Sequence, residues 1–297
     1  MGNIESISYF FPELVLTGTV VVALIADLVY SDRNSYKVGY LVIAGLAIAS
    51  LVLWLSPPGE TTPIFLNTIV VDPFSRIFKF VFLLATFFVI LMSINSDELK
   101  SVRTGEYFTL MAVMVLGMSL MASSVDLIMV YLSIEVVSIV SFILAGYLRA
   151  QVRSNEAALK YVIYGAFSSG LMLYGLSLLY GLTGTTKLFE LSGAVSSLGP
   201  GSNLTLTVAT ILIMAGFGYK VAIVPFHFWT PDVYEGAPTP VTAYLSVAPK
   251  AAGFALLIRF FNTLFGTGQP LNSPVWQVME GVPWQDILMV LAAVTMT

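Results

Sequence analysis

Cysteine is absent from this sequence, histidine occurs once, and charged residues make up only 10% of the chain. The lack of cysteine excludes disulfides, iron–sulfur clusters held by thiolates and cysteine-based zinc sites. A single histidine argues against a haem or metal site with several histidine ligands. Soluble globular chains carry about 25% charged residues, so the scarcity of charge, with 57% hydrophobic residues and a mean hydropathy of +0.89, indicates a polytopic membrane protein. The formal charge of −4 and the lack of a basic cluster give no indication of nucleic-acid binding.

Long apolar runs define the predicted fold. A helix needs about 20 mostly apolar residues to cross about 30 Å of hydrocarbon. By that measure we expect an all-α membrane protein, a polytopic helix bundle with about eight complete transmembrane helices plus the start of a ninth, with helix 7 broken at Pro225. The eight complete spans are predicted at residues 9–30, 38–55, 73–94, 107–123, 126–148, 156–181, 205–224 and 241–264.

Capping residues support several of these boundaries. Asp72 precedes Pro73, which combines an N-cap with proline at the first helical position. Asp126 and Asn155 are expected to cap the fifth and sixth helices. The Gly-, Ser- and Thr-rich segment 182–204 is predicted to be a loop.

The ninth helix is expected to start near Pro283 and to stop at Thr297. About fourteen residues cover only about 21 Å at 1.5 Å each, which is too short to span. We therefore expect the sequence to be an N-terminal portion of a longer protein, with a re-entrant C-terminal helix as the alternative.

The basic residues predict an orientation. Loops after odd-numbered helices hold six of them and loops after even-numbered helices hold only Lys187, which favours a cytoplasmic position for the odd-numbered loops and an N-terminus outside. Arg76, Lys79 and Arg259 lie near helix ends, where we expect them to snorkel to the interface. The six basic loop residues are Arg33, Lys37, Lys100, Arg103, Arg149 and Arg153.

Four charged residues fall inside apolar spans: Glu135, Lys160, Lys220 and Lys250. A charge at bilayer depth costs roughly 2.5–3.5 kcal/mol, so these residues are candidates for a proton or ion path. Glu135 has no basic neighbour three or four positions away on its own helix, so a partner must come from another helix. The alternatives are a structural glutamate bonded to hydroxyls such as those of Ser133 and Ser138, and a Lys160 that only snorkels.

The segment after Lys220 contains Pro225 and the single histidine, His227. Proline cannot donate a backbone hydrogen bond and crowds the preceding turn. A helix broken at depth is tolerated where its backbone lines a cavity, and such breaks mark ion sites in many transporters. Seven residues separate Lys220 from His227, two turns along one face if the helix resumes its phase. We expect His227 to act as a relay between Lys220 and Lys250; a purely structural histidine is the alternative.

The run from Pro225 to Ser246, PFHFWTPDVYEGAPTPVTAYLS, is followed by Pro249 and Lys250 and resembles the subunit N family of proton-pumping NADH:quinone oxidoreductases, respiratory complex I. The part from Tyr234 onward, YEGAPTPV, separates this family from the sister antiporter-like subunits L and M. The resemblance extends over the whole chain and includes Glu135 in helix 5.

The resemblance implies a proton path through Glu135, Lys160, Lys220 and Lys250, to which the position of His227 beside the predicted break adds this histidine. It also implies three parts: transmembrane helices 1–3 in residues 1–106, a five-helix antiporter-like repeat in residues 107–264, and a loop with the start of helix 9, a truncated second repeat, in residues 265–297.

The resemblance implies no cofactor in this chain, with NAD, FMN, iron–sulfur clusters and quinone in other subunits. The implied partners are other membrane subunits of complex I, among them the sister antiporter-like subunits and small membrane subunits, and the lipid bilayer, with no nucleic acid. The implied location is a bacterial-type inner (plasma) membrane. A subunit of a multi-subunit cation/proton antiporter, and a non-transporting scaffold whose charges only specify helix packing, stay open as alternatives.

Overall fold

The computed structural model describes residues 3–56, 61–100, 102–265 and 284–296. Eight helices in this part are long and apolar enough to cross a membrane, which confirms the predicted all-α bundle. They are α2 (Phe11–Val29), α3 (Lys37–Leu55), α4 (Pro73–Ile94), α5 (Gly105–Ser123), α6 (Leu127–Ala145), α7 (Val152–Thr183), α9 (Asn203–Val221) and α11 (Thr239–Phe265).

Short elements connect the spans. The loop predicted at the start of 265–297 falls mostly in residues 266–283, which lie outside the described residues; α13 follows them. The helices are α1 (Asn3–Ile7), α8 (Leu188–Ser196), α10 (Trp229–Gly236) and α13 (Trp284–Met296), with the 3-10 turns η1 (Asp32–Asn34), η2 (Asp97–Leu99) and η3 (Pro200–Ser202). Strands β1 (Thr62–Ile64) and β2 (Ile69–Val71) form an antiparallel hairpin in which Thr62 pairs with Val71.

The local signals at helix starts were correct in two cases of three. Asp72 accepts a hydrogen bond from the Ser75 amide at 2.8 Å and completes a capping box, and Asp126 accepts one from the Ile128 amide at 2.9 Å. The cap predicted at Asn155 is wrong, because α7 begins at Val152 and Asn155 donates to the Arg149 carbonyl. The predicted loop 182–204 is also wrong in part, since it contains α8.

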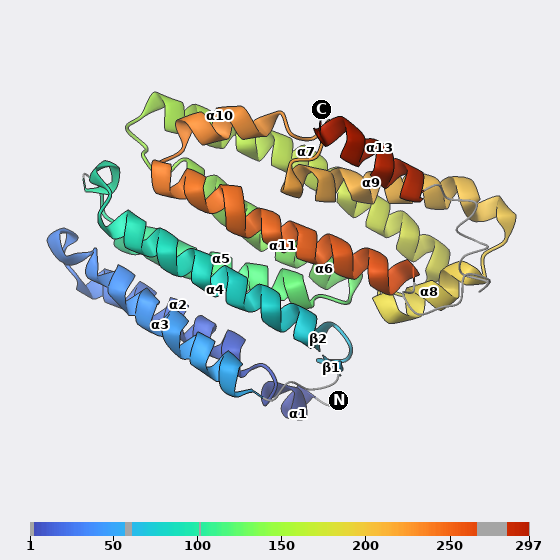
Figure 1. The fold of residues 1–297 in the computed structure, drawn as a ribbon, viewed down its shortest axis with the longest axis horizontal. Helices are drawn as coiled ribbons and strands as arrows, with labels where there is room; N and C mark the ends of the chain where they lie inside the picture. The colour runs from blue at the N-terminus through green and yellow to red at the C-terminus, as the bar shows by residue number, and fades with distance from the viewer. Residues whose placement is uncertain (1–2, 57–60, 101, 266–283, 297) are drawn as a thin grey trace.

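The spans form one elongated bundle (Figure 1). Helices α2 and α3 pack on α4 and α5 at one side, α11 and α6 lie in the middle, and α7 packs with α9 and α10 at the other side. Helices α7 and α9 approach closely because of glycine: a Cβ on Gly175 would lie 2.8 Å from the Ala209 carbonyl oxygen, and one on Gly216 would lie 2.5 Å from the Met172 sulfur.

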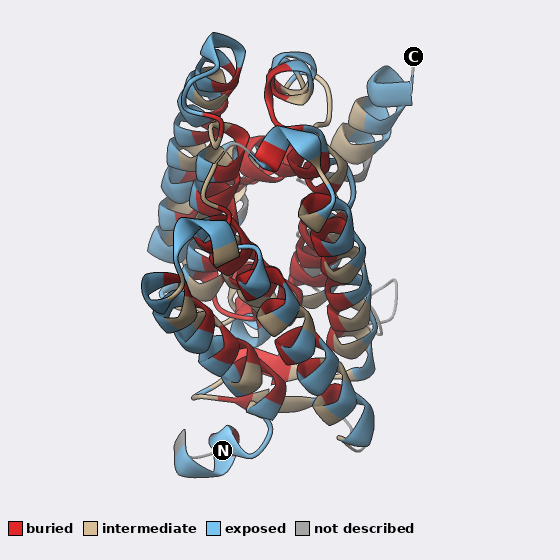
Figure 2. Ribbon diagram, turned by 90° about the vertical axis from the view of Figure 1, so that its left-hand side faces the viewer, coloured by how far each residue is buried: buried red, intermediate tan, exposed pale blue. Residues whose placement is uncertain are grey.

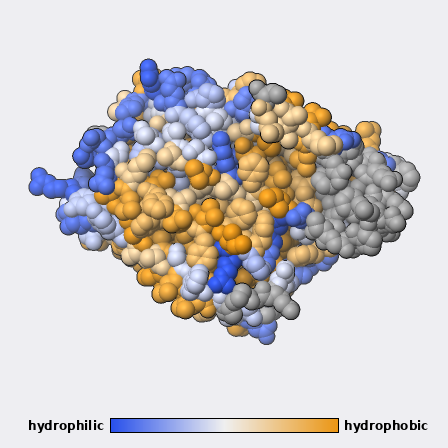
Figure 3. Space-filling view, viewed as in Figure 1, coloured by the Kyte–Doolittle hydropathy of each residue, from blue (hydrophilic) through white to orange (hydrophobic). Residues whose placement is uncertain are grey.

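Buried residues face the inside of the bundle (Figure 2). Among the eight spans α5 is the most enclosed. The outer surface is largely apolar over the middle of the face in Figure 3, while hydrophilic residues gather over the end where α10 and the start of α7 lie. This pattern is typical of a protein that presents apolar side chains to lipid between two polar ends.

Candidate functional site

The site is built around the end of α9. This helix stops at Val221, and Ala222 adopts a left-handed conformation with φ 61° and ψ 45°. A non-helical segment with Pro225 then leads to α10, which begins at Trp229. The predicted break is therefore present, but the helix does not resume its phase, so His227 does not continue the helical face of Lys220 as expected.

Lys220 lies in the last turn of α9 and is only 3% exposed. Its Nζ donates a hydrogen bond to Ser138 Oγ on α6 at 3.1 Å. A positive charge in this position is stabilised by the negative end of the helix dipole. On the α11 side, Gly253 leaves room for the lysine stem, because a Cβ there would lie 3.2 Å from Lys220 Cγ. The structure thus encloses this lysine side chain by packing from two helices.

Glu135 lies one turn before Ser138 on α6, about 4.5 Å along the helix axis. It accepts a hydrogen bond from Ser169 on α7, whose hydroxyl lies 3.2 Å from that of Tyr131. In the described part of the chain Glu135 forms no ion pair, and Lys220 is bonded instead to Ser138, one turn further along α6. The hydroxyl partner of Glu135 is Ser169, not Ser133 or Ser138, and the sequence analysis did not identify it.

The segment after the break carries polar atoms into the interior. His227 Nδ1, Thr230 Oγ1 and Tyr234 Oη are buried and have no hydrogen-bond partner among the described residues. Burial raises the pKa of Tyr234 to about 12, so its hydroxyl stays neutral. Lys250 on α11 is half-buried, with its ammonium 5.2 Å from the centre of the Tyr234 ring. Buried polar atoms without partners are costly, so their presence here makes this segment a candidate site.

Lys160 belongs to a charged cluster at the end of the bundle where α10 packs on α7. Its Nζ lies 2.8 Å from Glu156 and 3.1 Å from Asp232 of α10, and Arg153 lies 3.7 Å from Glu235. These side chains line a hollow of about 120 Å³. Lys160 is 37% exposed at this end of the bundle, and its pair with Asp232 ties α10 to α7.

Two of the three snorkelling predictions are wrong. Lys79 is buried and lies 2.6 Å from Glu13 of α2. Arg259 is buried and donates to both carboxylate oxygens of Asp72, at 2.8 and 2.9 Å. Both side chains point into the bundle because each forms an ion pair with an acidic residue of another segment. The sequence pattern of a single helix cannot show such a partner. Arg76, the third, donates to a backbone carbonyl at the end of α3.

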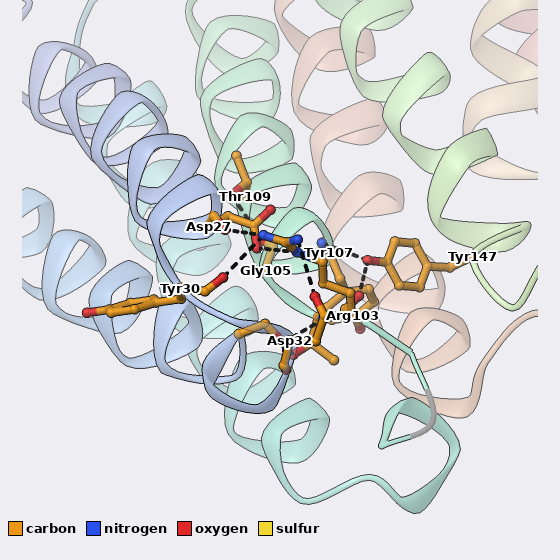
Figure 4. A network of polar contacts seen from close by, with 10 residues as sticks. Asp27, Tyr30, Asp32, Arg103, Gly105, Tyr107, Thr109 and Tyr147 are labelled. Atoms are coloured by element: carbon orange, nitrogen blue, oxygen red, sulfur yellow. Dashed lines mark hydrogen bonds and ion pairs between the residues drawn. The ribbon is translucent and has the colours of Figure 1, made fainter.

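A further network joins α2 to the start of α5 (Figure 4). Arg103 lies between the carboxylates of Asp27 and Asp32, at 3.1 and 3.3 Å, and also donates to the carbonyls of Asp27 and Tyr30 at the end of α2. Tyr147 donates to the Arg103 carbonyl at 2.6 Å. The network is a helix C-cap made by an arginine from another segment.

In the described ranges, no group of three or more His, Cys, Asp or Glu side chains could hold a metal ion. A bundle of eight spans, with ionisable side chains at a helix broken inside it, defines a class of polytopic membrane proteins that includes ion transporters. The family described as NADH:quinone oxidoreductase/Mrp antiporter, transmembrane, matches residues 124–296. The chain belongs to this family, and its curated relatives assign it to the subunit N branch, which confirms the resemblance seen in the sequence.

Two relatives illustrate the similarity. NADH-quinone oxidoreductase subunit N 2 of Chloroherpeton thalassium is 46% identical over 97% of this chain and 56% of the relative, and subunit N of an Anaeromyxobacter species is 44% identical over 99% and 58%. The chain thus spans little more than half the length of the curated relatives it matches.

Solved structures agree with this fold. A chain of respiratory complex I from Thermus thermophilus matches with a TM-score of 0.70 and 31% identity, covering 84% of this chain and 52% of that one. A chain of the Mrp complex from a Dietzia species matches with a TM-score of 0.70 and 25% identity, covering 91% and 29%.

Proposed function

We propose that this chain carries part of a proton path across the membrane, driven by quinone reduction in other subunits of an NADH:quinone oxidoreductase. The observation that carries the proposal is Lys220, which is only 3% exposed at the point where α9 breaks. It is bonded to Ser138, and Ser138 lies one helical turn from Glu135 on α6. Burying an ammonium at this position costs free energy, and ionisable residues inside membrane spans usually have a functional role.

The proposed route begins at the mouth formed by Lys160 and continues to Lys220. Approach of the Glu135 carboxylate stabilises the Lys220 ammonium, and its withdrawal favours release of the proton. His227 and the unpartnered hydroxyls beside it then connect the break to Lys250. Moving one charge against 100 mV takes about 2.3 kcal/mol, and hydrogen bonds to charged groups are worth about 1.5–3 kcal/mol, so a change in the pairing of Lys220 is of the required size.

We infer the wider setting from the relatives. Residues 107–264 form the antiporter-like repeat, packed on the helices in 1–106, and 265–297 begin a second repeat. NAD, FMN, iron–sulfur clusters and quinone belong to other subunits, and the partners are neighbouring membrane subunits. The bacterial relatives support a location in a bacterial plasma membrane, and the distribution of basic residues supports an N-terminus outside.

The decisive experiment measures protons pumped per NADH oxidised by the reconstituted complex with Lys220→Ala in the full-length subunit. We expect pumping to fall at least severalfold, with all subunits present. The matched control is Lys187→Ala, which removes an exposed lysine whose nearest acid is Glu190 at 3.4 Å. Full pumping by an assembled Lys220→Ala complex would mean that the buried charges only specify helix packing.

A cation/proton antiporter is the second candidate, favoured by the fold shared with a chain of the Mrp complex. The same proteoliposomes distinguish the two functions. Sodium-dependent proton movement that needs no NADH oxidation would support antiport, whereas movement that depends strictly on redox turnover supports the proposed role.

A further inference from the structure

A pocket separate from the charged path lies at the opposite side of the bundle, where α3 begins and α4 ends. Its volume is about 350 Å³, within the roughly 300–1,000 Å³ typical of small-molecule sites. It lies where two apolar spans give way to polar connections, at the level of lipid headgroups. The residues that matter here are Arg33, Tyr36, Ser96 and Lys100 at the polar rim and Leu99 and Phe108 on the apolar wall.

The charges of the pocket do not balance. Asp32 is engaged by Arg103 at 3.3 Å (Figure 4), and Asp97 by Lys100 at 2.5 Å. Arg33 forms no ion pair with any described residue. The Lys100–Asp97 pair is exposed on both sides, and pairs of that kind are worth little, so Lys100 can exchange its partner for a stronger anion. The pocket therefore offers one free cation and one exchangeable cation.

Hydroxyl groups complete a polar rim suited to phosphate oxygens. Neither the Tyr36 nor the Ser96 hydroxyl is hydrogen-bonded to another described side chain, so both can donate. In contrast, the deeper hydroxyls are used: Ser35 donates to the Asp32 carbonyl at 2.9 Å and lies 3.2 Å from the Thr104 hydroxyl. The hydroxyls without a side-chain partner therefore lie at the rim of the pocket and not at its floor.

The apolar part of the pocket continues along the outside of the bundle. Leu99 and Phe108 are fully buried beneath the rim, while Tyr40, Leu91 and Met92 are exposed on the adjoining turns of α3 and α4. An inorganic anion would leave this apolar surface uncovered, whereas an acyl chain would pack against it. The required ligand carries a negative headgroup and an apolar tail.

We propose that this pocket binds an anionic phospholipid, with its phosphate between Arg33 and Lys100 and its acyl chains along α3 and α4. Basic pockets between transmembrane helices commonly bind acidic headgroups, and the anionic lipids of the cytoplasmic leaflet are attracted to basic residues near the surface. The site does not depend on the proton path proposed above and takes no part in it.

Because these 297 residues contain no cysteine, one introduced thiol can be assigned to a single peptide of this part of the subunit. The full complex with Ser96→Cys is placed in nanodiscs of phosphatidylcholine, with or without phosphatidylglycerol, and alkylation at that position is followed by peptide mass spectrometry. We expect phosphatidylglycerol to slow alkylation on the order of tenfold. Arg33→Gln and Lys100→Gln should each weaken this protection about tenfold, the equivalent of about 1.4 kcal/mol in lipid affinity.

Lys37→Gln is the matched control, because it removes an exposed cation near Arg33 that does not line the pocket. It should leave protection within about twofold, as expected for a screened surface charge. Equal effects of Lys37→Gln and Arg33→Gln would overturn the site in favour of diffuse attraction. Protection by inorganic phosphate alone would overturn the lipid, and protection in phosphatidylcholine alone would show that another chain or a neutral lipid fills the pocket.

Discussion

Replacing Asp72 with asparagine separates two contributions of one side chain at the start of α4. Asparagine caps a helix about as well as aspartate, so Asp72→Asn keeps the bond to the Ser75 amide and removes only the charge that faces Arg259. The guanidinium would stay 6% exposed, bonded to the Ala122 carbonyl at 2.7 Å and 5.0 Å from the Phe74 ring, but without a counter-charge.

Removing one partner of a buried ion pair costs about 3–5 kcal/mol. Asp72 retains 11% exposure, so we expect a smaller loss of about 2 kcal/mol, roughly 30-fold in a local opening equilibrium. Hydrogen–deuterium exchange of the assembled complex should show this increase in the first turn of α4 and near Arg259 on α11. Asp72→Ala should add about 1 kcal/mol for the lost cap.

The pH dependence checks the assignment. Burial alone would raise the pKa of the Asp72 carboxyl, but the hydrogen bond and charge of Arg259 outweigh it and hold the pKa below the ordinary 3.8. The ion pair therefore contributes fully at every pH above 3.8 and is lost as the pH falls through the lowered pKa. The difference between wild type and Asp72→Asn should be constant at neutral pH and should disappear in acid. Equal exchange rates at neutral pH would refute the reasoning.

Two further changes test the packing. Gly253→Ala would bring a Cβ to 3.2 Å from Lys220 Cγ and 2.8 Å from a neighbouring valine methyl, so we expect pumping per NADH to fall while the complex still assembles. Gly193→Ala is the control: its Cβ would meet nothing within 4 Å, so it should change neither pumping nor assembly. Lys79→Met leaves Glu13 buried without its partner, a loss on the order of 3–5 kcal/mol, and should lower the yield of assembled complex in a native gel without changing pumping per complex. Adding Glu13→Gln should restore much of the yield, and an effect on pumping alone would contradict a structural role.

Much of the fold could be predicted from the sequence, because the signals involved are local. Twenty apolar residues in a row specify a span whatever surrounds them, and Asp72 and Asp126 cap helices through bonds to their own next turn. The cap predicted at Asn155 is wrong because α7 begins four residues earlier than the sequence pattern indicates. Gln151 occupies the N-cap position, where its side chain forms no capping hydrogen bond.

The site was harder to predict, because its contacts join residues far apart in the chain. The sequence identified Lys220 as a charge in an apolar span, but its partner Ser138 is 82 residues away. The sequence predicts Lys79 and Arg259 to be interfacial, because no residue of α4 or α11 indicates the acids on other elements that pair with them inside the bundle. The left-handed turn at Ala222 was equally hidden, because alanine does not favour that conformation.

The length of α7 has a consequence for the membrane itself. Its 32 residues extend about 48 Å, well beyond a hydrocarbon layer of about 30 Å, and a tilt large enough to hide the difference lies outside the usual range. The excess must project into water, and the bond from Lys160 to Asp232 fixes α10 to that projection. Bilayer thickness then sets how deep the charged cluster around Lys160 lies. A thicker membrane would bring this cluster closer to the hydrocarbon, and a thinner membrane would leave it further out in water.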